Sequence, residues 1–390
     1  MEIIISPNSF KGTFSSIDAC NIIAEGLLNY DSKLIIKKLP IADGGDGTLE
    51  IFKYYFDYDS IKESSVNSIG EKIESEYIII ENGKTAIIEF ANTCGLAKVD
   101  FNKNDLNISN SFGFGLQVKS AIERGVENII LTLGGSATID GGCGAMIALG
   151  VKFYDDKENI IKDKNPIVYA NSIDFSSSIV NKKNINFTIL SDVNNTIFGN
   201  NGCVNVYGKQ KGLKNSQIPI FENYLKKISL KFKKQFNKNI SNIKSGGAAG
   251  GAAGFLKLFL NAELHFGSEY IFNKINYCKN INEGSILITG EGRIDEQTLN
   301  MKAPFSLVNY LKNKNIFSVA IGGIVDYKCL NILLKSFDLI FSTSESNDNI
   351  KSLSVARKNL LTTSFEIAGI IKHKINNNYI NYLKNTFENK

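Results

Sequence analysis

The sequence predicts an α/β fold of two domains, each with a mainly parallel sheet. Short apolar runs alternate with amphipathic segments along the chain, and this alternation is typical of parallel sheets covered by helices. A chain of 390 residues is too long for one ordinary domain. The composition also changes near residue 65, which indicates that a second domain begins there.

The first elements follow one another in regular order. The apolar run Glu2–Ser6 predicts a buried strand, and Ser15 or Ser16 can cap the helix after it. Lys33–Leu39 is typical of the next strand, and a further helix is expected to begin near Thr48. A strand, a helix and a second strand in this order predict a parallel pair.

The central part of the chain contains a hairpin signal and a glycine-rich segment. Glu76–Ile80 and Thr85–Phe90 flank Asn82-Gly83, which is a strong signal for a hairpin turn. Apolar residues follow Ser245–Gly254 directly, so this segment is predicted to begin a closely packed helix and not to be a linker. The remaining predicted elements are a helix over Ser111–Arg124 and strands over Asn128–Leu133, Asn186–Leu190, Ser285–Thr289, Phe317–Ile321 and Leu339–Phe341.

The domain boundaries are predicted from the change in composition and the later return of apolar strands. Residues 1–65 and 285–390 are expected to form one discontinuous, Rossmann-like α/β domain. Residues 66–284 are expected to form a second α/β domain inserted into it. No short-period repeat argues for another architecture.

Composition excludes several classes of protein. The net charge of +5 is small and spread along the chain, which argues against binding to nucleic acid. Only two histidines are present, so neither a zinc site nor a Ser-His-Asp triad is expected. Six scattered cysteines without a CxxC pair are typical of reduced cytosolic thiols. The N-terminus does not resemble a signal peptide, and no apolar stretch is long enough to span a bilayer. We therefore expect a cytoplasmic protein that does not bind membranes.

Polar, glycine-rich segments follow the predicted strands, where open α/β sheets bind their ligands. In Ser6–Thr13, Lys11 stands between a strand and a helix and can face an anion. In Pro40–Thr48, Asp43 and Asp46 bracket glycines and can hold Mg²⁺ through water. The structural alternatives are a solvated lysine and a tight Asp-Gly turn.

Two further segments follow apolar strands in the central part. In Leu133–Gly144, bare backbone and the hydroxyls of Ser136 and Thr138 predict a cradle for a phosphate or carboxylate at a helix start. In Ser191–Asn195, the carboxylate of Asp192 ends a strand. A role for Asp192 as a simple helix cap is the alternative.

The last segments carry charges of both signs between glycines. Such charges after a buried strand favour a phosphoryl-transfer site over a surface ion pair. The charged residues are Lys209 and Lys211 in Tyr207–Gly212, and Glu291, Arg293 and Asp295 in Leu287–Asp295.

The signatures of several nucleotide-binding families are absent. The sequence contains no GxxxxGKS or GxxxxGKT loop, no GxGxxG after a strand, and neither HRD nor DFG. A P-loop ATPase, a nicotinamide dehydrogenase and a protein kinase are therefore not expected.

Taken in order, the polar segments resemble the signatures of the class I glycerate kinase family. The likeness extends from about residue 3 to about residue 325. It implies ATP, Mg²⁺ and glycerate as ligands, phosphorylation most often at the 2-hydroxyl, and a site in the cleft between two α/β domains. The segments are SPNSFKGTFSS, PIADGGDGTLE, LGGSATIDGGCGAMIALG, SDVNNTIFGNNGCVNVYGKQKG and ITGEGRIDEQTLNMKAP.

Three positions depart from the usual family pattern. Asn8 stands where an acidic residue is usual, Asp46 where Glu is usual, and Ile139 where Asn is frequent. The first two positions concern the metal and phosphate contacts. The carboxylates at Asp43 and Asp192 are retained.

The resemblance also implies roles for individual residues. Asp192 is predicted to accept the proton of the glycerate hydroxyl, with Asp295 as the second candidate, and Lys11 and Arg293 to offset phosphate charge. A homodimer is expected. The predicted metal ligands are Asp43, Asp46 and Glu291, and the predicted phosphate- and substrate-binding residues are Ser9, Gly134, Gly135, Ser136, Thr138, Asn194, Lys209 and Lys211.

Two other functions are weighed against this one. A sugar-phosphate mutase would need a phosphorylatable serine or a His/Glu pair, and no serine has a convincing nucleophile context. A non-catalytic protein that senses ATP or glycerate would need an output module, and we predict none.

Overall fold

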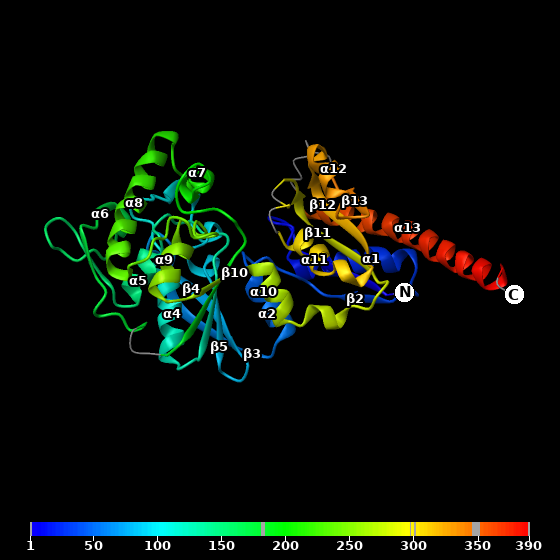
Figure 1. The fold of residues 1–390 in the computed structure, drawn as a ribbon, viewed down its shortest axis with the longest axis horizontal. Helices are drawn as coiled ribbons and strands as arrows, with labels where there is room; N and C mark the ends of the chain where they lie inside the picture. Colours follow the sequence, from blue (N-terminus) through cyan, green and yellow to red (C-terminus); the bar gives the residue numbers. More distant parts are fainter. Residues whose placement is uncertain (1, 181–183, 297, 300–301, 345–351, 389–390) are drawn as a thin grey trace. The chain divides into compact units, whose positions relative to one another are not determined.

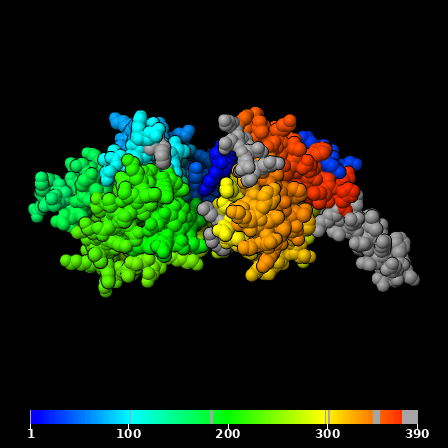
Figure 2. All heavy atoms as spheres, turned by 90° about the horizontal axis from the view of Figure 1, so that it is seen from above, coloured from blue at the N-terminus to red at the C-terminus, as the bar shows by residue number. Residues whose placement is uncertain are grey.

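The computed structural model describes the chain except residues 1, 181–183, 297, 300–301, 345–351 and 389–390. It forms two compact units: unit 1 comprises residues 1–42 and 271–390, and unit 2 comprises residues 43–270 (Figure 1). Unit 1 is thus discontinuous in sequence. Figure 2 shows blue atoms from the start of the chain beside orange and red atoms of its last third, as the contact between the first and last helices requires.

The bounds of these units differ from the predicted boundaries at 65 and 285. Strand β3 (Tyr58–Val66) pairs along its whole length with β4 (Lys72–Ile80) of unit 2. Most side chains of β3 are exposed, so its polar composition resembled a loop. Tyr277 is buried in unit 1, where its hydroxyl contacts that of Ser6. Residues near both boundaries therefore belong to a different unit from the one predicted.

Unit 1 is built on a parallel sheet with the strand order β13–β12–β11–β1–β2. The predicted strands of this region are all present, with shifted ends. The strands are β1 (Ile3–Pro7), β2 (Ile36–Lys38), β11 (Ile286–Ile294), β12 (Phe317–Val325) and β13 (Leu339–Ser342). The helices are α1 (Ser16–Tyr30), α11 (Ala303–Tyr310), α12 (Leu330–Leu333) and α13 (Leu353–Glu388), and α10 (Gly267–Lys274) spans the boundary between the units.

Helices cover both faces of this sheet. Val319 of β12 packs with α1 and α13, whereas the next residue, Ala320, packs with Leu333 of α12 on the opposite face. Side chains alternate between the faces of a strand, and both faces of this one are buried. The apolar sequence of β12 is therefore that of a central strand in a doubly wound sheet.

The strand order of unit 1 reverses between β1 and β11. The chain passes from β1 to β2 in one direction across the sheet and from β11 to β12 in the other. The register pairs Pro7 with Gly290 at this point. Open α/β sheets bind ligands at the carboxyl ends of strands where the order reverses, and the segments that follow Pro7 and Gly290 lie at that place.

Unit 2 contains a mixed sheet with the order β10–β9–β6–β5–β4–β3. Strands β5, β6, β9 and β10 are parallel, and the predicted hairpin of β4 and β5 is confirmed. The remaining strands are β5 (Thr85–Glu89), β6 (Asn128–Thr132), β7 (Lys152–Tyr154), β8 (Ser172–Asp174), β9 (Asn186–Ser191) and β10 (Glu263–Phe266). The helices are α2 (Thr48–Tyr55), α3 (Ala91–Cys94), α4 (Phe112–Glu123), α5 (Cys143–Ala148), α6 (Pro166–Tyr169), α7 (Cys203–Tyr207), α8 (Ile218–Phe236) and α9 (Ala252–Phe259).

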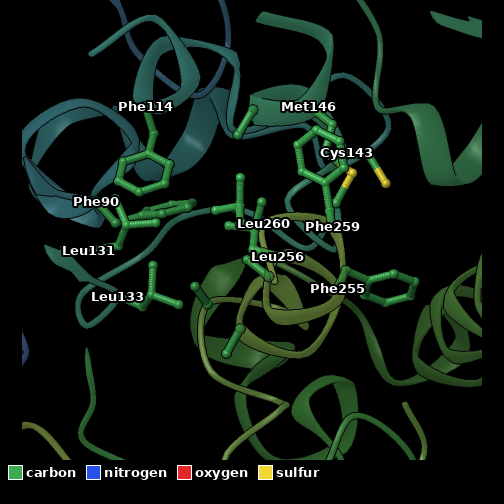
Figure 3. Close-up of a cluster of buried hydrophobic side chains, with 14 of the residues drawn as sticks. Phe90, Phe114, Leu131, Leu133, Cys143, Met146, Phe255, Leu256, Phe259 and Leu260 are labelled. Atoms are coloured by element: carbon green, nitrogen blue, oxygen red, sulfur yellow. The ribbon is translucent and has the colours of Figure 1, made fainter. Parts of the chain in front are cut away.

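One large apolar core fills unit 2. Figure 3 shows Phe255, Leu256 and Phe259 of α9 near Cys143 and Met146 of α5, all of them buried. The predicted helix after the glycine-rich segment is thus confirmed as α9. The core fixes the loops that precede α5 and α9.

The described part of the fold contains neither a disulfide nor a membrane-spanning helix. The cysteines are free, and all except Cys278 are buried. Burial raises the pKa of the Cys94 and Cys203 thiols to about 12. None of the described helices is both long and apolar enough to cross a bilayer.

Candidate active site

Polar residues and glycines gather at one edge of the unit 2 sheet. Glu89 is the last residue of β5, Gly134 follows β6, and Asp192 follows β9 directly. These strands are neighbours and run in the same direction, so their carboxyl ends lie at the same edge. Open α/β sheets bind ligands at this edge.

The loop before α2 packs against this edge through contacts between glycines. A Cβ atom on Gly134 would lie 2.3 Å from the Cα of Gly45, and one on Gly44 would lie 2.8 Å from the Cα of Gly267. Side chains do not tolerate such distances, so the close approach requires glycine. The contacts bring the segment Asp43–Thr48 to the carboxyl edge.

Two carboxylates approach the same point in this loop. Asp43 is buried, and its Oδ1 accepts the amide of Gly45 at 3.0 Å. A Cβ atom on Gly45 would lie 2.9 Å from Oδ1 of Asp43 and 3.4 Å from Oδ2 of Asp192. Asn194 adds a buried Oδ1 that has no partner among the described residues. Oxygen atoms of this kind are suitable ligands for Mg²⁺.

The turn Gly134–Ser136 presents bare backbone amides. Gly135 has a φ of +72°, a left-handed conformation that favours glycine. Within the part of the chain that the structure describes, the amides of Gly134, Gly135 and Ser136 donate to no protein acceptor. Successive amides in such a turn form a concave site for an anion.

Lys211 supports this turn from the protein interior. Its side chain is 3% exposed, and Nζ donates to the hydroxyl of Ser136 at 2.6 Å and to the carbonyl of Thr138 at 3.0 Å. Burial lowers the pKa of Lys211 to about 8. Lys209 belongs to the same short 3₁₀ helix but is exposed. Of these two predicted ligands of phosphate, only Lys209 therefore presents its ammonium group to solvent.

The predicted helix after Leu133–Gly144 is α5, and a carboxylate occupies its first turn. Helix α5 starts at Cys143, and Asp140 accepts the amide of Gly144 in its first turn at 3.0 Å. The Thr138 hydroxyl donates to the same carboxylate at 3.2 Å. The expected helix N-terminus is thus already occupied by a carboxylate, and the bare amides are those of Gly134–Ser136.

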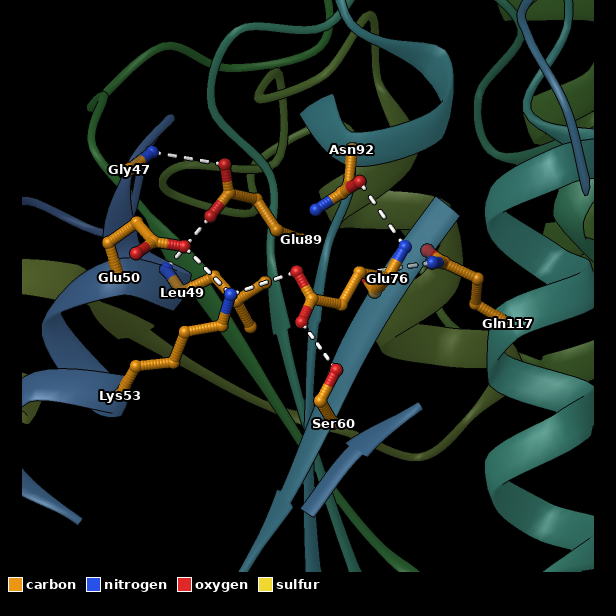
Figure 4. Close-up of polar contacts among 9 residues, drawn as sticks. All are labelled: Gly47, Leu49, Glu50, Lys53, Ser60, Glu76, Glu89, Asn92 and Gln117. Atoms are coloured by element: carbon orange, nitrogen blue, oxygen red, sulfur yellow. Dashed lines mark hydrogen bonds and ion pairs between the residues drawn. The ribbon is translucent and has the colours of Figure 1, made fainter. Parts of the chain in front are cut away.

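Glu89 is a candidate residue that the sequence analysis missed. Its side chain is 4% exposed, and its two oxygens accept the amides of Gly47 at 3.0 Å and Leu49 at 2.9 Å (Figure 4). Burial, reinforced by the nearby Asp46, raises the pKa of Glu89 to about 8. The available signal was a charged residue at the end of an otherwise apolar strand.

In unit 1, the first and last polar segments meet at the point where the strand order reverses. The amide of Asn8 donates to the carbonyl of Gly290 at 2.7 Å, and its side chain accepts the amide of Ser9 at 2.9 Å. A Cβ atom on Gly292 would lie 3.1 Å from the amide nitrogen of Lys11. The exposed Lys11 therefore lies beside the end of β11.

The charged residues of β11 and the loop after it contact one another. Glu291 is buried, accepts the hydroxyl of Thr298 at 2.8 Å and lies 3.5 Å from Nζ of Lys302. The same hydroxyl oxygen accepts the amide of Asp295 at 3.1 Å. Nε of the exposed Arg293 lies 3.1 Å from Asp295. Thr298 and Lys302 were not predicted as site residues, although they hold Glu291.

The predicted site residues form one set in each unit. In the described residues, no cluster of three or more His, Cys, Asp or Glu side chains is arranged to hold a metal ion. Kinase sites commonly bind Mg²⁺ through one or two carboxylates together with substrate phosphates, and Asp43 and Asp46 offer two carboxylates in one loop. The unit 2 set is Asp43, Asp46, Gly134, Gly135, Ser136, Thr138, Asp192, Asn194, Lys209 and Lys211, and the unit 1 set is Ser9, Lys11, Glu291, Arg293 and Asp295.

Both sheets place charged side chains at the carboxyl ends of parallel strands, the arrangement found in α/β enzymes that bind small anionic ligands. The model of the glycerate kinase family matches residues 3–372. A glycerate kinase of Bacillus cereus is 33% identical over 95% of this chain and 98% of its own length. The glycerate 2-kinase of Escherichia coli K12 is 31% identical over 89% of this chain and 91% of its own.

A solved structure agrees with these sequence relatives. A crystal structure assigned as glycerate kinase 2 of Salmonella typhimurium LT2 matches with a TM-score of 0.79 and 28% identity, over 96% of this chain and 99% of that chain. This chain belongs to the glycerate kinase family. It is therefore an ATP-dependent kinase that acts on an alcohol group. The predicted family, enzyme class and α/β fold class are confirmed.

Proposed function

We propose that the protein transfers the γ-phosphate of ATP to the 2-hydroxyl of D-glycerate, which gives 2-phosphoglycerate and ADP. The observation that carries the proposal is the approach of Asp43 and Asp192 to one point, beside the bare amides of Gly134–Ser136. Carboxylates and amides at one edge suit a reaction in which an anion is held and a hydroxyl loses its proton. The name of the Escherichia coli relative, glycerate 2-kinase, supports the 2-hydroxyl as the acceptor.

Asp192 is the proposed base. The glycerate hydroxyl oxygen forms a bond to the γ-phosphorus, the bond from that phosphorus to the bridging oxygen of ADP breaks, and the hydroxyl proton passes to the carboxylate. Asp192 lies at the end of β9 and is partly exposed, as a group that meets substrate must be. Asp295 is the second candidate, because it also follows a strand end and is partly exposed.

Mg²⁺ is the proposed cofactor, and its charge would offset that of the phosphates. Asp43 and Asp46 would hold it in unit 2, where the unpartnered oxygen of Asn194 offers a further ligand. Within unit 1, Glu291 is a further proposed metal ligand, and Thr298 already orients its carboxylate.

Phosphate and substrate groups are proposed to bind through amides, hydroxyls and cations. The turn Gly134–Ser136 would hold an anion on its backbone, and Thr138 and Lys211 would act through their hold on that turn. Lys11, Lys209 and Arg293 are exposed, and we propose that they contact phosphate oxygens directly. Ser9 and Asn194 complete the proposed set.

The cellular setting and partners are part of the proposal. The protein is proposed to be cytoplasmic and homodimeric and to bind small molecules only. The small net charge of +5 supports the absence of a nucleic-acid partner.

A coupled assay for ADP tests the proposal. ADP should be released only when ATP, Mg²⁺ and D-glycerate are all present. Folded protein that releases no ADP under these conditions would overturn the proposal. Binding of ATP or glycerate without turnover would indicate a sensing protein, and phosphate migration within a sugar phosphate without ATP would indicate a mutase.

A further inference from the structure

We propose that Glu89 is a positioning residue that fixes the loop Asp43–Thr48, and with it the carboxylates of Asp43 and Asp46. The inference rests on the proposed function, because these carboxylates matter only if they meet substrate or Mg²⁺. Glu89 itself would not touch the reacting atoms. It would act by holding the loop on the sheet.

The start of helix α2 needs an acceptor that its own sequence does not supply. Its N-cap residue is Gly47, which has a φ of +88° and no side chain to cap the helix. The first amides of a helix have no partner within the helix. Glu89 supplies both oxygens from another element, one to the amide of Gly47 and one to that of Leu49 (Figure 4).

Glu89 belongs to a central strand of the sheet. All residues of β5 are buried, and the strand pairs on one side with β4 and on the other with β6. The backbone of Glu89 is held by strand pairing on both sides of β5, whereas the backbone of a loop residue is not. The position of Gly47 relative to the sheet edge is therefore set by Glu89.

The loop Asp43–Thr48 is also held at Gly45. The hydroxyl of Thr48 donates to the carbonyl of Gly45 at 2.7 Å, and Gly45 lies against Gly134. Asp46 stands between this contact and the residue that Glu89 binds. Loss of Glu89 would release the Asp46 side of the loop while leaving the glycine contact in place.

A comparison of Glu89→Ala with Glu89→Gln in the full chain tests this role of Glu89. Amide hydrogen exchange of residues 43–49 is measured together with kcat and KM for ATP and glycerate, at a temperature where thermal melts show folded protein. In Glu89→Ala, exchange at Gly47 and Leu49 should rise by roughly tenfold or more, because each amide loses the side-chain oxygen to which it donates. The value of kcat/KM should fall by about 10², as expected for small displacements of reacting groups.

Glutamine should restore part of the loss. Its carbonyl oxygen can accept one of the two amides, but its NH₂ group can accept neither. Activity and exchange in Glu89→Gln should therefore lie between those of the wild type and Glu89→Ala. If Glu89→Ala does not fold, this intermediate behaviour of Glu89→Gln decides the proposal.

Glu76→Gln is the matched control. Glu76 lies on the neighbouring strand β4, and its carboxylate binds Lys53 at 2.8 Å and Ser60 at 2.6 Å instead of the loop (Figure 4). This variant should keep wild-type exchange at Gly47 and Leu49 and wild-type kcat/KM.

Two results would overturn the proposal. One is wild-type exchange at Gly47 and Leu49 in Glu89→Ala. The other is faster exchange with unchanged kcat/KM, which would make Glu89 a helix cap without a role in the reaction. A wild-type protein that shows no turnover with glycerate would refute the proposed function alone, since the exchange measurement does not depend on activity.

Discussion

The side-chain nitrogen of Lys211 lies 2.6 Å from the hydroxyl oxygen of Ser136, within a turn whose backbone amides are available to an anion. The lysine is buried and donates also to the carbonyl of Thr138. Two bonds to successive parts of one turn hold its backbone in place. The two lysines therefore differ in role. Lys211 supports the turn from the interior, whereas Lys209 presents its charge to solvent.

Lys211→Met should lower stability and substrate affinity together. Methionine keeps the apolar stem but leaves the Ser136 hydroxyl and the Thr138 carbonyl without their donor, which costs about 1–3 kcal/mol for buried groups. Thermal melts and Michaelis constants for ATP and glycerate measure the two effects. The exposed Lys209→Met should change stability by less than about 0.5 kcal/mol. Equal melting temperatures for both variants would contradict the interior role of Lys211.

Stability should rise with pH between about 8 and 10.5 because of Lys211. In this range the unfolded chain keeps the proton of this lysine and the folded protein releases it, so the free energy of unfolding increases with pH. The gain is on the order of 1–3 kcal/mol. Urea unfolding of the wild type and Lys211→Met across this range isolates the contribution. A difference between the two proteins that does not change with pH would refute the assignment.

Gly134→Ala should be more damaging than Gly135→Ala. The new Cβ at Gly134 would lie 2.3 Å from the Cα of Gly45, and backbone cannot move aside without separating the two loops. At Gly135 the nearest atoms are side-chain carbons 3.3 Å away, and the φ of +72° costs an alanine about 1 kcal/mol or more.

Kinetics and melts of both glycine variants check this order. Gly135→Ala should remain folded with raised Michaelis constants, whereas Gly134→Ala should lose most of its turnover. Unchanged kinetics in a folded Gly134→Ala would show that the contact with Gly45 does not serve the reaction.

Asp192→Asn should fold normally and lose roughly 10²- to 10⁴-fold in kcat, the usual contribution of a general base. Asparagine keeps the shape of the side chain but cannot take the hydroxyl proton. Asp295→Asn is the comparison, because Asp295 is the second candidate for this role. Near-normal turnover in Asp192→Asn with a large loss in Asp295→Asn would move the base to unit 1.

Much of the fold follows from the sequence because buried parallel strands have a strong signature. The apolar runs before Pro7 and Leu133 are strands, and the residues after them lie where ligands are expected. Strand β3 was not predicted, because an exposed edge strand carries polar side chains on most of its positions. Its membership of unit 2 depends on pairing with β4, which no local pattern reveals.

The site was less predictable, because burial and partners decide what each side chain does. Lys209 and Lys211 are two lysines of one glycine-bounded loop, and the sequence does not distinguish them. In the structure Lys209 is exposed, whereas Lys211 is buried beneath the turn. Thr138 was predicted to line an anion cradle, but its hydroxyl donates to Asp140, whose carboxylate accepts the amide of Gly144 at the start of α5. Glu89 lies in no motif that was noted in the sequence. It is identified only by its hydrogen bond to the amide of Gly47 in the loop before α2.

The phosphorus NMR spectrum of the product distinguishes transfer to the 2-hydroxyl of glycerate from transfer to the 3-hydroxyl. Purified protein is incubated with ATP, Mg²⁺ and D-glycerate, and the proton-coupled signal of the new phosphomonoester is recorded. The carbon at position 2 of glycerate bears one hydrogen and that at position 3 bears two, so the two products give a doublet and a triplet. We expect a doublet, with ADP formed in equal amount. A triplet would contradict transfer to the 2-hydroxyl, and unchanged ATP and glycerate in the presence of folded protein would contradict phosphoryl transfer itself.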